Sequence, residues 1–285
     1  MQHMDDRRWT RRDLGAAGVG AVALVATSTT ADAKTRPPAN FDPAIRYRER
    51  ARELRDFLRV QGDLSGALAP WWWSGYCVGV TPTENPRVLF ACEGCETKKV
   101  IRRGAGQFEV WSKVMTCFKD PQTLEILNGR EFLNPYTNMV NQVEPNITGS
   151  KTLYSVAADG QIMAKPLEGG MAEAALTPVW LRNGDKVQVS AARKYPQKRP
   201  IPLAEFGTQT VDLAALLDDR LERVEAVFAA TFIAPWQRFL AMPQQAGHAV
   251  WHAVGRKARG FDELSPAYLE QARKYIPDVL AWSPA

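Results

Sequence analysis

Two histidines near the C-terminal end are the residues of this sequence best suited to acid–base chemistry. His248 and His252 are spaced four residues apart, and the chain has only one other histidine, His3. This spacing puts both side chains on one face of the segment, whether it is a helix or a strand. Two imidazoles within reach of each other can divide the roles of acid and base near neutral pH, or supply two ligands to a metal ion.

Glu93 is the natural third member of this candidate site. Gly75 and Gly94 leave room beside the strands that would neighbour its carboxylate. If the protein is an enzyme, we expect His248 and His252 to be a cofactor-free catalytic pair that Glu93 orients. Two other interpretations stay open. The three residues form a metal site, or the histidines are structural and bond to the backbone or to a glutamate at the end of a barrel.

Large aromatic side chains mark the expected ligand-binding wall. Trp71 and Trp73 alternate along a β-rich segment, so they share one face of a strand while Trp72 takes the other. An interior of rings with a few polar groups is typical of a pocket for a flat apolar ligand, although rings also simply fill small barrels. The predicted ligand-binding residues are Trp71, Trp73, Tyr76, Asn134, Tyr136, Trp251 and Arg256.

Three of these residues have polar side chains with an expected role in binding. Tyr76 or Asn134 would donate a hydrogen bond to the ligand, and Asn134 has the alternative of fixing its own loop through an Asx turn. Arg256 belongs to a basic cluster after the histidines, which would act as an anion clamp or form a solvated edge.

The segments that must position these residues predict a mainly β protein. Four strands are expected, at 71–80, 87–102, 107–118 and 124–132. Further on, Asn183-Gly184 between alternating runs is a strong hairpin signal. Because no helices are expected between residues 69 and 190, the strands should pair antiparallel. We therefore predict a curved antiparallel sheet or a lipocalin-like barrel.

Helices are expected at the two ends of this sheet. The range 45–58 has the apolar spacing of a short amphipathic helix. Ser265-Pro266 is an N-cap and first-turn pair that opens a terminal helix ending near Ile276. The range 211–234 stays open, because its composition favours a helix and its alternation favours a strand.

All four cysteines lie close together in the sequence, at Cys77, Cys92, Cys95 and Cys117. A C-x-x-C pair at 92–95 suggests redox chemistry or half of a zinc site in a cytosolic protein. Here the pair lies in an expected strand and has no second close pair. Buried thiols or structural disulfides are therefore the favoured interpretation.

The N-terminus has the pattern of a twin-arginine export signal. Arginine pairs precede an apolar run that is shorter than the roughly 20 residues needed to span a bilayer, and Ala31-Asp32-Ala33 resembles a cleavage site. We predict a signal at 1–33, a linker at 34–44 and a single β-rich domain at 45–285. The mature protein would be periplasmic or secreted, without a membrane span, and the export machinery would be a partner.

Composition and missing motifs narrow the function. The net charge of +5 in 285 residues is too small and too dispersed to indicate nucleic-acid binding. The sequence lacks a Gly-rich phosphate loop, a Gly-x-Ser-x-Gly elbow and a Rossmann fingerprint. Nucleotide cofactors and serine hydrolysis are therefore disfavoured.

Three motifs carry a family resemblance. They are the strand at 89–94 (LFACEG), the turn Asp120-Pro121-Gln122-Thr123, and the segment at 132–137 (FLNPYT). Together they resemble the domain-of-unknown-function 1838 family over about residues 50 to 280. The resemblance implies a mostly β fold and favours a strand at 224–234, but it implies no reaction.

The expected function is the binding of a small apolar or aromatic molecule by an exported β protein. If it is an enzyme, it would carry out cofactor-free acid–base chemistry (as an isomerase, lyase or hydrolase) with the histidine pair. The alternatives are a non-catalytic lipocalin-like carrier and a metalloprotein that uses His248, His252 and Glu93.

Overall fold

The computed structural model describes residues 43–104, 106–169, 173–194 and 204–280. The predicted signal, residues 1–33, lies outside these ranges, and so does most of the predicted linker. The described residues belong to one compact unit that begins at Pro43. Among them, no helix is both long and apolar enough to cross a bilayer.

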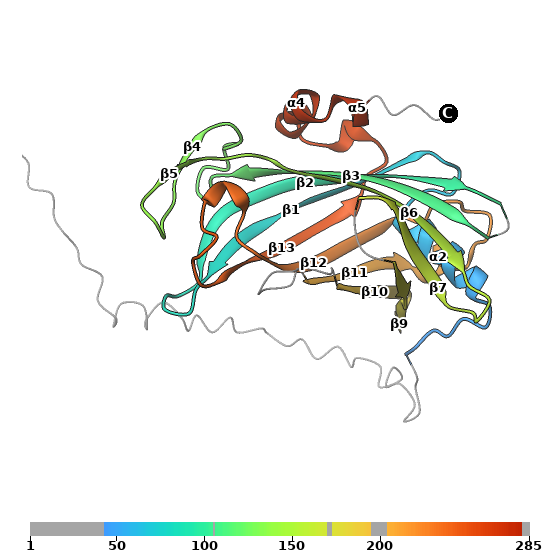
Figure 1. Cartoon of the computed structure of the whole chain (residues 1–285). Coiled ribbons are helices and arrows are strands. Elements are labelled where there is room, and N and C mark those ends of the chain that lie inside the picture. Colours follow the sequence, from blue (N-terminus) through green and yellow to red (C-terminus); the bar gives the residue numbers. More distant parts are fainter. Residues whose placement is uncertain (1–42, 105, 170–172, 195–203, 281–285) are drawn as a thin grey trace, which may run out of the picture. The chain divides into compact units, whose positions relative to one another are not determined.

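An antiparallel sheet of eleven strands dominates the fold, in the order β8-β7-β6-β3-β2-β1-β13-β12-β11-β10-β9 (Figure 1). The strands are β1 (Leu68–Val80), β2 (Arg87–Arg102), β3 (Phe108–Lys119), β6 (Asn146–Val156), β7 (Ile162–Glu168), β8 (Ala174–Leu176), β9 (Val179–Asn183), β10 (Lys186–Lys194), β11 (Ala204–Asp212), β12 (Ala226–Ala234) and β13 (His248–Lys257). A separate hairpin pairs β4 (Glu131–Leu133) with β5 (Val140–Gln142). The prediction of a mainly β, antiparallel protein is confirmed.

The sheet does not close into a barrel. Its two edge strands, β8 and β9, follow each other in the chain but do not pair. The free edge of β9 is occupied instead by the segment before the first helix: Ala44 bridges Leu181, and Ile45 N donates to Trp180 O at 3.0 Å. An open curved sheet, rather than a barrel, is therefore the form observed.

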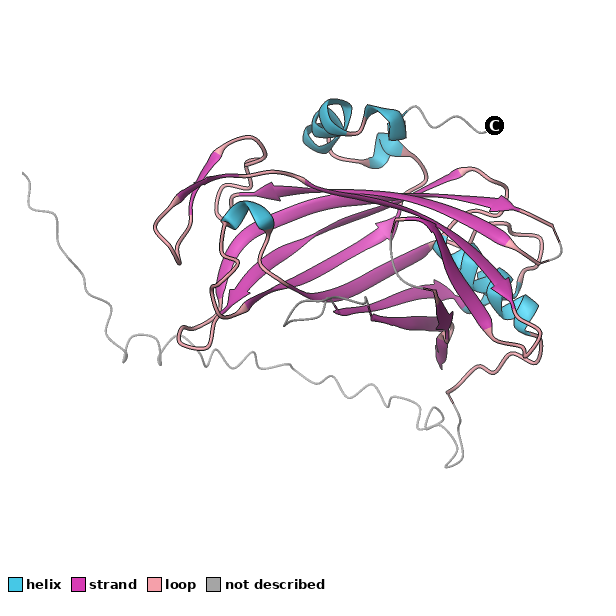
Figure 2. Ribbon diagram, viewed as in Figure 1, coloured by secondary structure: helices cyan, strands magenta, loops and turns pink. Residues whose placement is uncertain are grey.

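The curvature gives the sheet two distinct faces (Figure 2). Side chains alternate between the faces along each strand. We call the face that carries Trp71, Trp73 and Trp251 the inner face, and the face that carries Trp72 and His252 the outer face. Paired residues of neighbouring strands share a face, so the register assigns every strand residue to one side.

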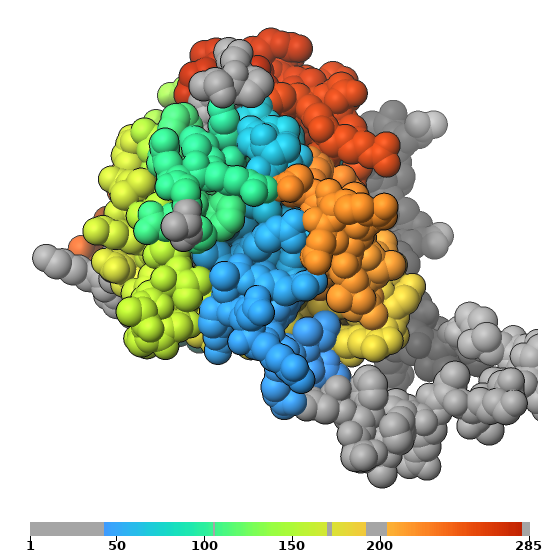
Figure 3. All heavy atoms as spheres, turned by 90° about the vertical axis from the view of Figure 1, so that its right-hand side faces the viewer, coloured from blue at the N-terminus to red at the C-terminus, as the bar shows by residue number. Residues whose placement is uncertain are grey.

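One helix, α2 (Arg50–Gln61), fills one end of the inner face. It begins later than the predicted range of 45–58 because residues 43–45 are extended along β9. Leu54, Phe57 and Leu58 are fully buried against β-strand residues such as Trp180. Seen from that end of the molecule, the atoms of α2 (blue) lie in the middle of the surrounding strands (Figure 3).

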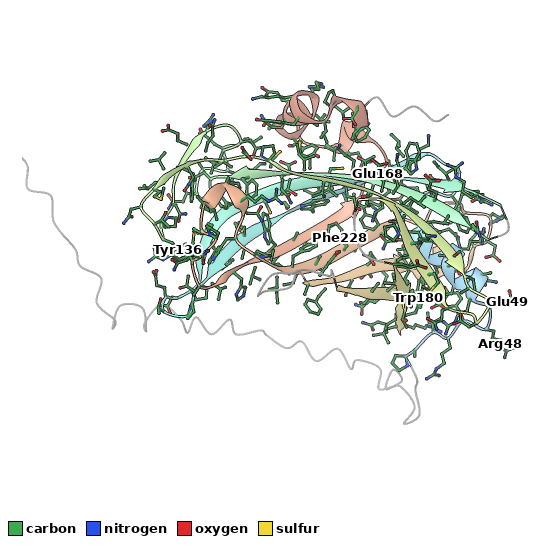
Figure 4. All side chains as sticks on the ribbon, in the orientation of Figure 1. Arg48, Glu49, Tyr136, Glu168, Trp180 and Phe228 are labelled. Carbon is green, nitrogen blue, oxygen red and sulfur yellow. The ribbon has the colours of Figure 1, made fainter. Side chains whose placement is uncertain are left out.

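An aromatic cluster closes the other end of the inner face. Phe118 and Phe239 pack edge to face with ring centroids 5.0 Å apart, and Trp236 and Leu240 are buried beside them. The short helix η2 (Arg238–Leu240) supplies part of this cluster. Tyr136 and Trp180 mark the two ends of the inner face, and Phe228 lies between them (Figure 4).

The C-terminal helices cover part of the outer face. Helix α4 (Pro266–Tyr275) begins at the predicted cap, where Tyr268 N donates to Ser265 Oγ at 3.1 Å. With η3 (Phe261–Glu263) and α5 (Pro277–Leu280) it packs over Cys95 and Met115 of β2 and β3. The range 211–234 holds both predicted forms: β11 ends at Asp212, α3 covers Leu213–Leu217, and β12 follows.

Candidate ligand-binding site

A cavity of about 1210 Å³ lies on the inner face, between α2 and the aromatic cluster. Its lining reaches from Phe57 and Leu58 of α2 to Trp236 and Phe239 at the other end. This volume is above the range of roughly 300–1,000 Å³ that is usual for small-molecule sites. The cavity therefore has room for a ligand of considerable size.

The opening of the cavity lies near the start of β6. Asn146 and Thr148 of β6 line the cavity and are exposed, as is Arg238 of η2. Strand β6 pairs with β7 only from Lys151 onward, so this part of β6 has a strand partner on one side only among the described residues.

Two aromatic rings form one wall at the middle of the cavity. Trp73 of β1 and Phe228 of β12 meet edge to face, with centroids 6.2 Å apart. Each ring occupies the space above a glycine on the neighbouring strand: a Cβ on Gly94 would lie 2.4 Å from the indole, and one on Gly255 would lie 2.6 Å from Phe228 Cε1. Any side chain at either glycine would push its ring out of place.

A row of small residues runs across the strands next to this wall. Ala253, Ala230, Gly207 and Ala191 pair in succession across β13, β12, β11 and β10, and all four line the cavity. Beyond the row, Trp251 pairs with Phe232, and both rings line the cavity. The small row therefore leaves a trough between two pairs of rings.

A bonded group of polar side chains lies at the α2 end. Lys98 Nζ donates to Gln61 Oε1 at 2.8 Å and lies 3.0 Å from Glu96 Oε2, while Ser112 Oγ donates to Glu96 Oε1 at 2.6 Å. The Lys98 ammonium also lies 5.7 Å from the centroid of the Trp71 ring. These polar atoms satisfy one another, and they anchor α2 to β2 and β3.

Trp71, Trp73 and Trp251 of the predicted ligand-binding set line the cavity. Trp71 has only 4% of its surface exposed, and its Nε1 donates to Gln61 O at 2.8 Å, so most of this ring is core. Tyr76 and Arg256 are exposed on the outer face, away from the cavity, because they have even numbers on β1 and β13 while the inner-facing tryptophans have odd ones.

The two predicted loop residues lie near the aromatic end. Asn134 is fully buried; its Nδ2 donates to Leu240 O at 3.1 Å, and its Oδ1 accepts from Tyr136 N at 3.0 Å. This is the Asx-turn arrangement, so Asn134 fixes its loop. The Tyr136 ring packs against Trp236 at 5.5 Å, and its hydroxyl is buried without a hydrogen-bond partner among the described residues.

The predicted catalytic residues do not meet in the cavity. His248 and His252 project from the outer face of β13, and His252 Nδ1 lies 3.2 Å from Thr231 Oγ1. On a strand, residues four apart are separated by about 13 Å, so the two imidazoles cannot share a proton or a metal ion. The expectation that they lie within reach of each other holds for a helix and is wrong for this strand.

Glu93 also faces outward, beneath the C-terminal helices. Its carboxylate accepts from Trp72 Nε1 at 2.8 Å and pairs with Lys119 Nζ at 2.5 Å. Strand spacings put it about 12 Å from His252, two strands away. The three residues therefore form no common site, and the described chain contains no group of three or more His, Cys, Asp or Glu side chains arranged to hold a metal ion.

The four cysteines are free and buried, and they divide between the two faces. Cys77 and Cys92 face inward, whereas Cys95 and Cys117 face outward beneath α4. Cys92 and Cys95 are three residues apart on one strand and so cannot act together. Burial raises the pKa of the Cys92 and Cys95 thiols to about 12, so neither is a ready nucleophile.

Sequence reasoning missed the polar residues that do line the cavity. Glu96 and Lys98 share a strand with Glu93 but have even numbers, and Glu205 and Gln209 lie on β11, just before the range left open. The alternation of side chains along each strand groups these residues by face. It does not say which group faces the cavity until the pairing of each strand with its neighbours, and so with Trp73, is known.

The fold and the cavity define an antiparallel β protein with a ligand-sized internal site on the inner face of an open, curved sheet. Comparison with known families gives a match to the model described as "Protein of unknown function (DUF1838)" over residues 68–281. The chain belongs to this family. The search of curated proteins and the search of solved structures found no match to this chain.

Proposed function

We propose that this protein binds a small, largely apolar molecule with ring character in the cavity of its inner face. The observation that carries the proposal is the trough of small residues between the Trp73–Phe228 and Trp251–Phe232 ring pairs, within a cavity of about 1210 Å³. Burial of apolar surface contributes about 25 cal/mol per Å². Aromatic walls provide this gain together with preferred ring-stacking geometries.

The geometry favours a carrier over the expected acid–base enzyme. His248, His252 and Glu93 all face away from the cavity, so they cannot act on a molecule bound there. A metal site built from the same three residues is also disfavoured, because the two histidines lie about 13 Å apart and Glu93 lies about 12 Å from His252. A lipocalin-like mode of action, with a ligand enclosed by a curved sheet, remains the proposal.

We also propose that the carrier acts outside the cytoplasm. The twin-arginine pattern at 1–33 supports export, with cleavage before Lys34. N-terminal sequencing of the protein from the exported fraction tests this: a mature chain that starts at Lys34 is expected, and an intact N-terminus in that fraction would contradict it.

Binding is tested with the apolar fluorophore N-phenyl-1-naphthylamine. We expect its fluorescence to rise on titration with the protein and to saturate at one site. Ala230→Leu fills the trough and should weaken binding at least tenfold. Ala229→Leu is the matched control, because Ala229 is the adjacent residue on the outer face and is exposed.

Two results would contradict the proposal. The first is the absence of saturable binding by the folded protein. The second is an equal effect of Ala230→Leu and Ala229→Leu on affinity. Thermal unfolding of each variant shows whether it is folded, and Gly207→Leu is a second trough-filling variant, because a Cβ there has no neighbour closer than 3.7 Å.

A further inference from the structure

Helices cover only one half of the outer face of the sheet. Cys95 of β2 and Met115 of β3 lie beneath α4 and are at most 2% exposed. The described helices leave the outer face of β12, β11 and β10 uncovered (Figure 1). On this uncovered half, six large apolar side chains have between 39% and 56% of their surface exposed: Tyr76, Val179, Leu181, Phe206, Val227 and Val254.

The strand register joins these side chains into one continuous surface, which we call the outer patch. Its central row crosses six strands through Ser74, Val254, Ala229, Thr208, Ser190 and Val179. A second central row runs beside it from Tyr76 on β1 to Phe206 on β11. The two flanking rows contain Val227 and Leu181 on one side and Ile233 on the other. Soluble monomers rarely expose a continuous apolar surface of this kind, so the outer patch indicates an interaction site.

The outer patch carries little charge. Its two central rows contain no Asp, Glu, Lys or Arg. In the flanking rows, Arg256 pairs with Glu263, and Lys194 occupies a corner position in the register. A surface that meets a copy of itself brings identical groups together, so like charges repel and apolar groups match. The outer patch is therefore suited to contact with a second copy of this chain.

The size of the outer patch also matches the requirement of a dimer. A standard interface uses about 20–30 residues and about 800 Å² of surface from each partner, and the four rows supply about twenty residues. Interfaces between identical subunits are more apolar than other protein surfaces. Two sheets can pack face to face with their layers about 10 Å apart. A second copy therefore fits the outer patch in both area and chemistry.

The edges of the sheet offer no comparable route to a dimer. Ala44 and Ile45 already occupy the edge of β9, and β8 at the opposite edge has only three residues. Covered or very short edge strands discourage pairing between sheets. Association through the face of the sheet is therefore favoured over association through its edges.

We propose that the protein is a homodimer in which the outer patches of two copies pack face to face about a two-fold axis. The two-fold dimer is the commonest closed assembly of identical subunits, and it requires a surface that complements itself. The cavity lies on the opposite, inner face of each copy. The inference therefore does not depend on the proposed function.

Sedimentation velocity of the full chain over a range of concentrations tests the dimer. We expect a dissociation constant that is micromolar or lower, as for other interfaces of standard size. Val254→Glu and Val227→Glu each bring a carboxylate from both copies into the interface, and each should weaken association at least about tenfold. Val140→Glu is the matched control, because Val140 is also an exposed strand valine but lies on the separate β4–β5 hairpin.

Three results would overturn the proposal. They are a protein that is monomeric at every concentration, a dimer that both Val254→Glu and Val227→Glu leave intact, and an equal loss of association in Val140→Glu. A monomer that cosediments with phosphatidylglycerol vesicles, and loses this binding in Val254→Glu, would assign the outer patch to a membrane surface instead. Thermal unfolding shows which variants are folded, and Phe206→Glu replaces either valine variant that is not.

The same measurement separates this inference from the proposed function. Ala230→Leu fills the trough on the inner face and should leave the dissociation constant of the dimer unchanged. A protein that dimerises through the outer patch but does not bind N-phenyl-1-naphthylamine would contradict the carrier alone. A monomer that binds the fluorophore would contradict the dimer alone.

Discussion

Trp72 Nε1 donates a hydrogen bond of 2.8 Å to Glu93 Oε1 on the outer face of the sheet, beneath helix α4. The other carboxylate oxygen pairs with Lys119 Nζ, and only 2% of the Glu93 surface is exposed. Glu93 therefore connects β1, β2 and β3 at the place where the C-terminal helices pack. Its charge contributes to stability rather than to the cavity.

Glu93 should make the free energy of unfolding decrease as the pH falls into the acid range. Burial raises the pKa of its carboxyl, but the hydrogen bonds from Lys119, Trp72 and Ser265 and the charge of Lys119 outweigh burial and hold it below 4.5. A lowered pKa in the folded state means that the unfolded state binds more protons. The contribution is therefore complete well above pH 4.5 and is lost as the pH falls through the folded-state pKa.

Substitution of Glu93 isolates this contribution. Glu93→Gln should lower the free energy of unfolding by about 2 kcal/mol at pH 7 and flatten its fall between pH 5 and the folded-state pKa. Urea unfolding from pH 3 to pH 7 measures both effects. Glu168→Gln is the control, because Glu168 pairs with Lys151 at an exposed site and should change stability little. If the free energy of unfolding falls with pH in the same way for wild type and Glu93→Gln, Glu93 is not the source of the pH dependence.

The two histidines should be dispensable for binding. His248 and His252 lie about 13 Å apart on the outer face of β13. His248→Ala and His252→Ala should leave the affinity for N-phenyl-1-naphthylamine unchanged and alter the free energy of unfolding by at most about 0.5 kcal/mol each. The same titration that tests Ala230→Leu provides the comparison. A tenfold loss of affinity in either histidine variant would return these residues to the binding site.

A single β-bulge determines the face of the sheet on which Glu93 lies. Between Cys77 and Val78 the pairing of β1 with β2 shifts by one residue. A ladder without that shift, continued from the Val78–Val88 pair, would place Glu93 opposite Trp73 and hence on the inner face. The observed register places Gly94 there. A one-residue shift exchanges the two faces of a strand, so the alternation of residues within β2 does not by itself assign Glu93 to a face.

Local patterns predicted what depends on near neighbours. Alternation placed Trp71 and Trp73 on one face, and Ser265 with Pro266 gave the start of α4. The long-range pairings were not accessible in this way. That residues 43–45 take the edge of β9, and that Glu205 and Gln209 face Phe232 and Phe228, follows from contacts between distant segments, which no local periodicity specifies.

The four thiols should be present and unreactive in the native protein. Burial raises the pKa of Cys117 to about 12 and that of Cys77 well above its ordinary value of 9.0. Titration with a chromogenic disulfide reagent at pH 8 should therefore detect no fast-reacting thiol in the folded state and four after unfolding in guanidinium chloride without reductant. Fewer than four thiols in the unfolded chain would indicate a disulfide.

Two tyrosines with buried hydroxyls should respond in opposite ways to the same substitution. The Tyr136 hydroxyl has no hydrogen-bond partner among the described residues, whereas Tyr268 OH donates to Met115 O at 3.3 Å. Tyr136→Phe removes an unsatisfied buried group and should raise the free energy of unfolding by about 1 kcal/mol, while Tyr268→Phe should lower it by about 1 kcal/mol. Denaturant unfolding of the two variants, at one pH, compares them directly.

A loss of stability in Tyr136→Phe would mean that its hydroxyl has a partner in solution. Because Tyr136 packs against Trp236 at the aromatic end, a simultaneous loss of affinity for N-phenyl-1-naphthylamine would place that partner in the cavity.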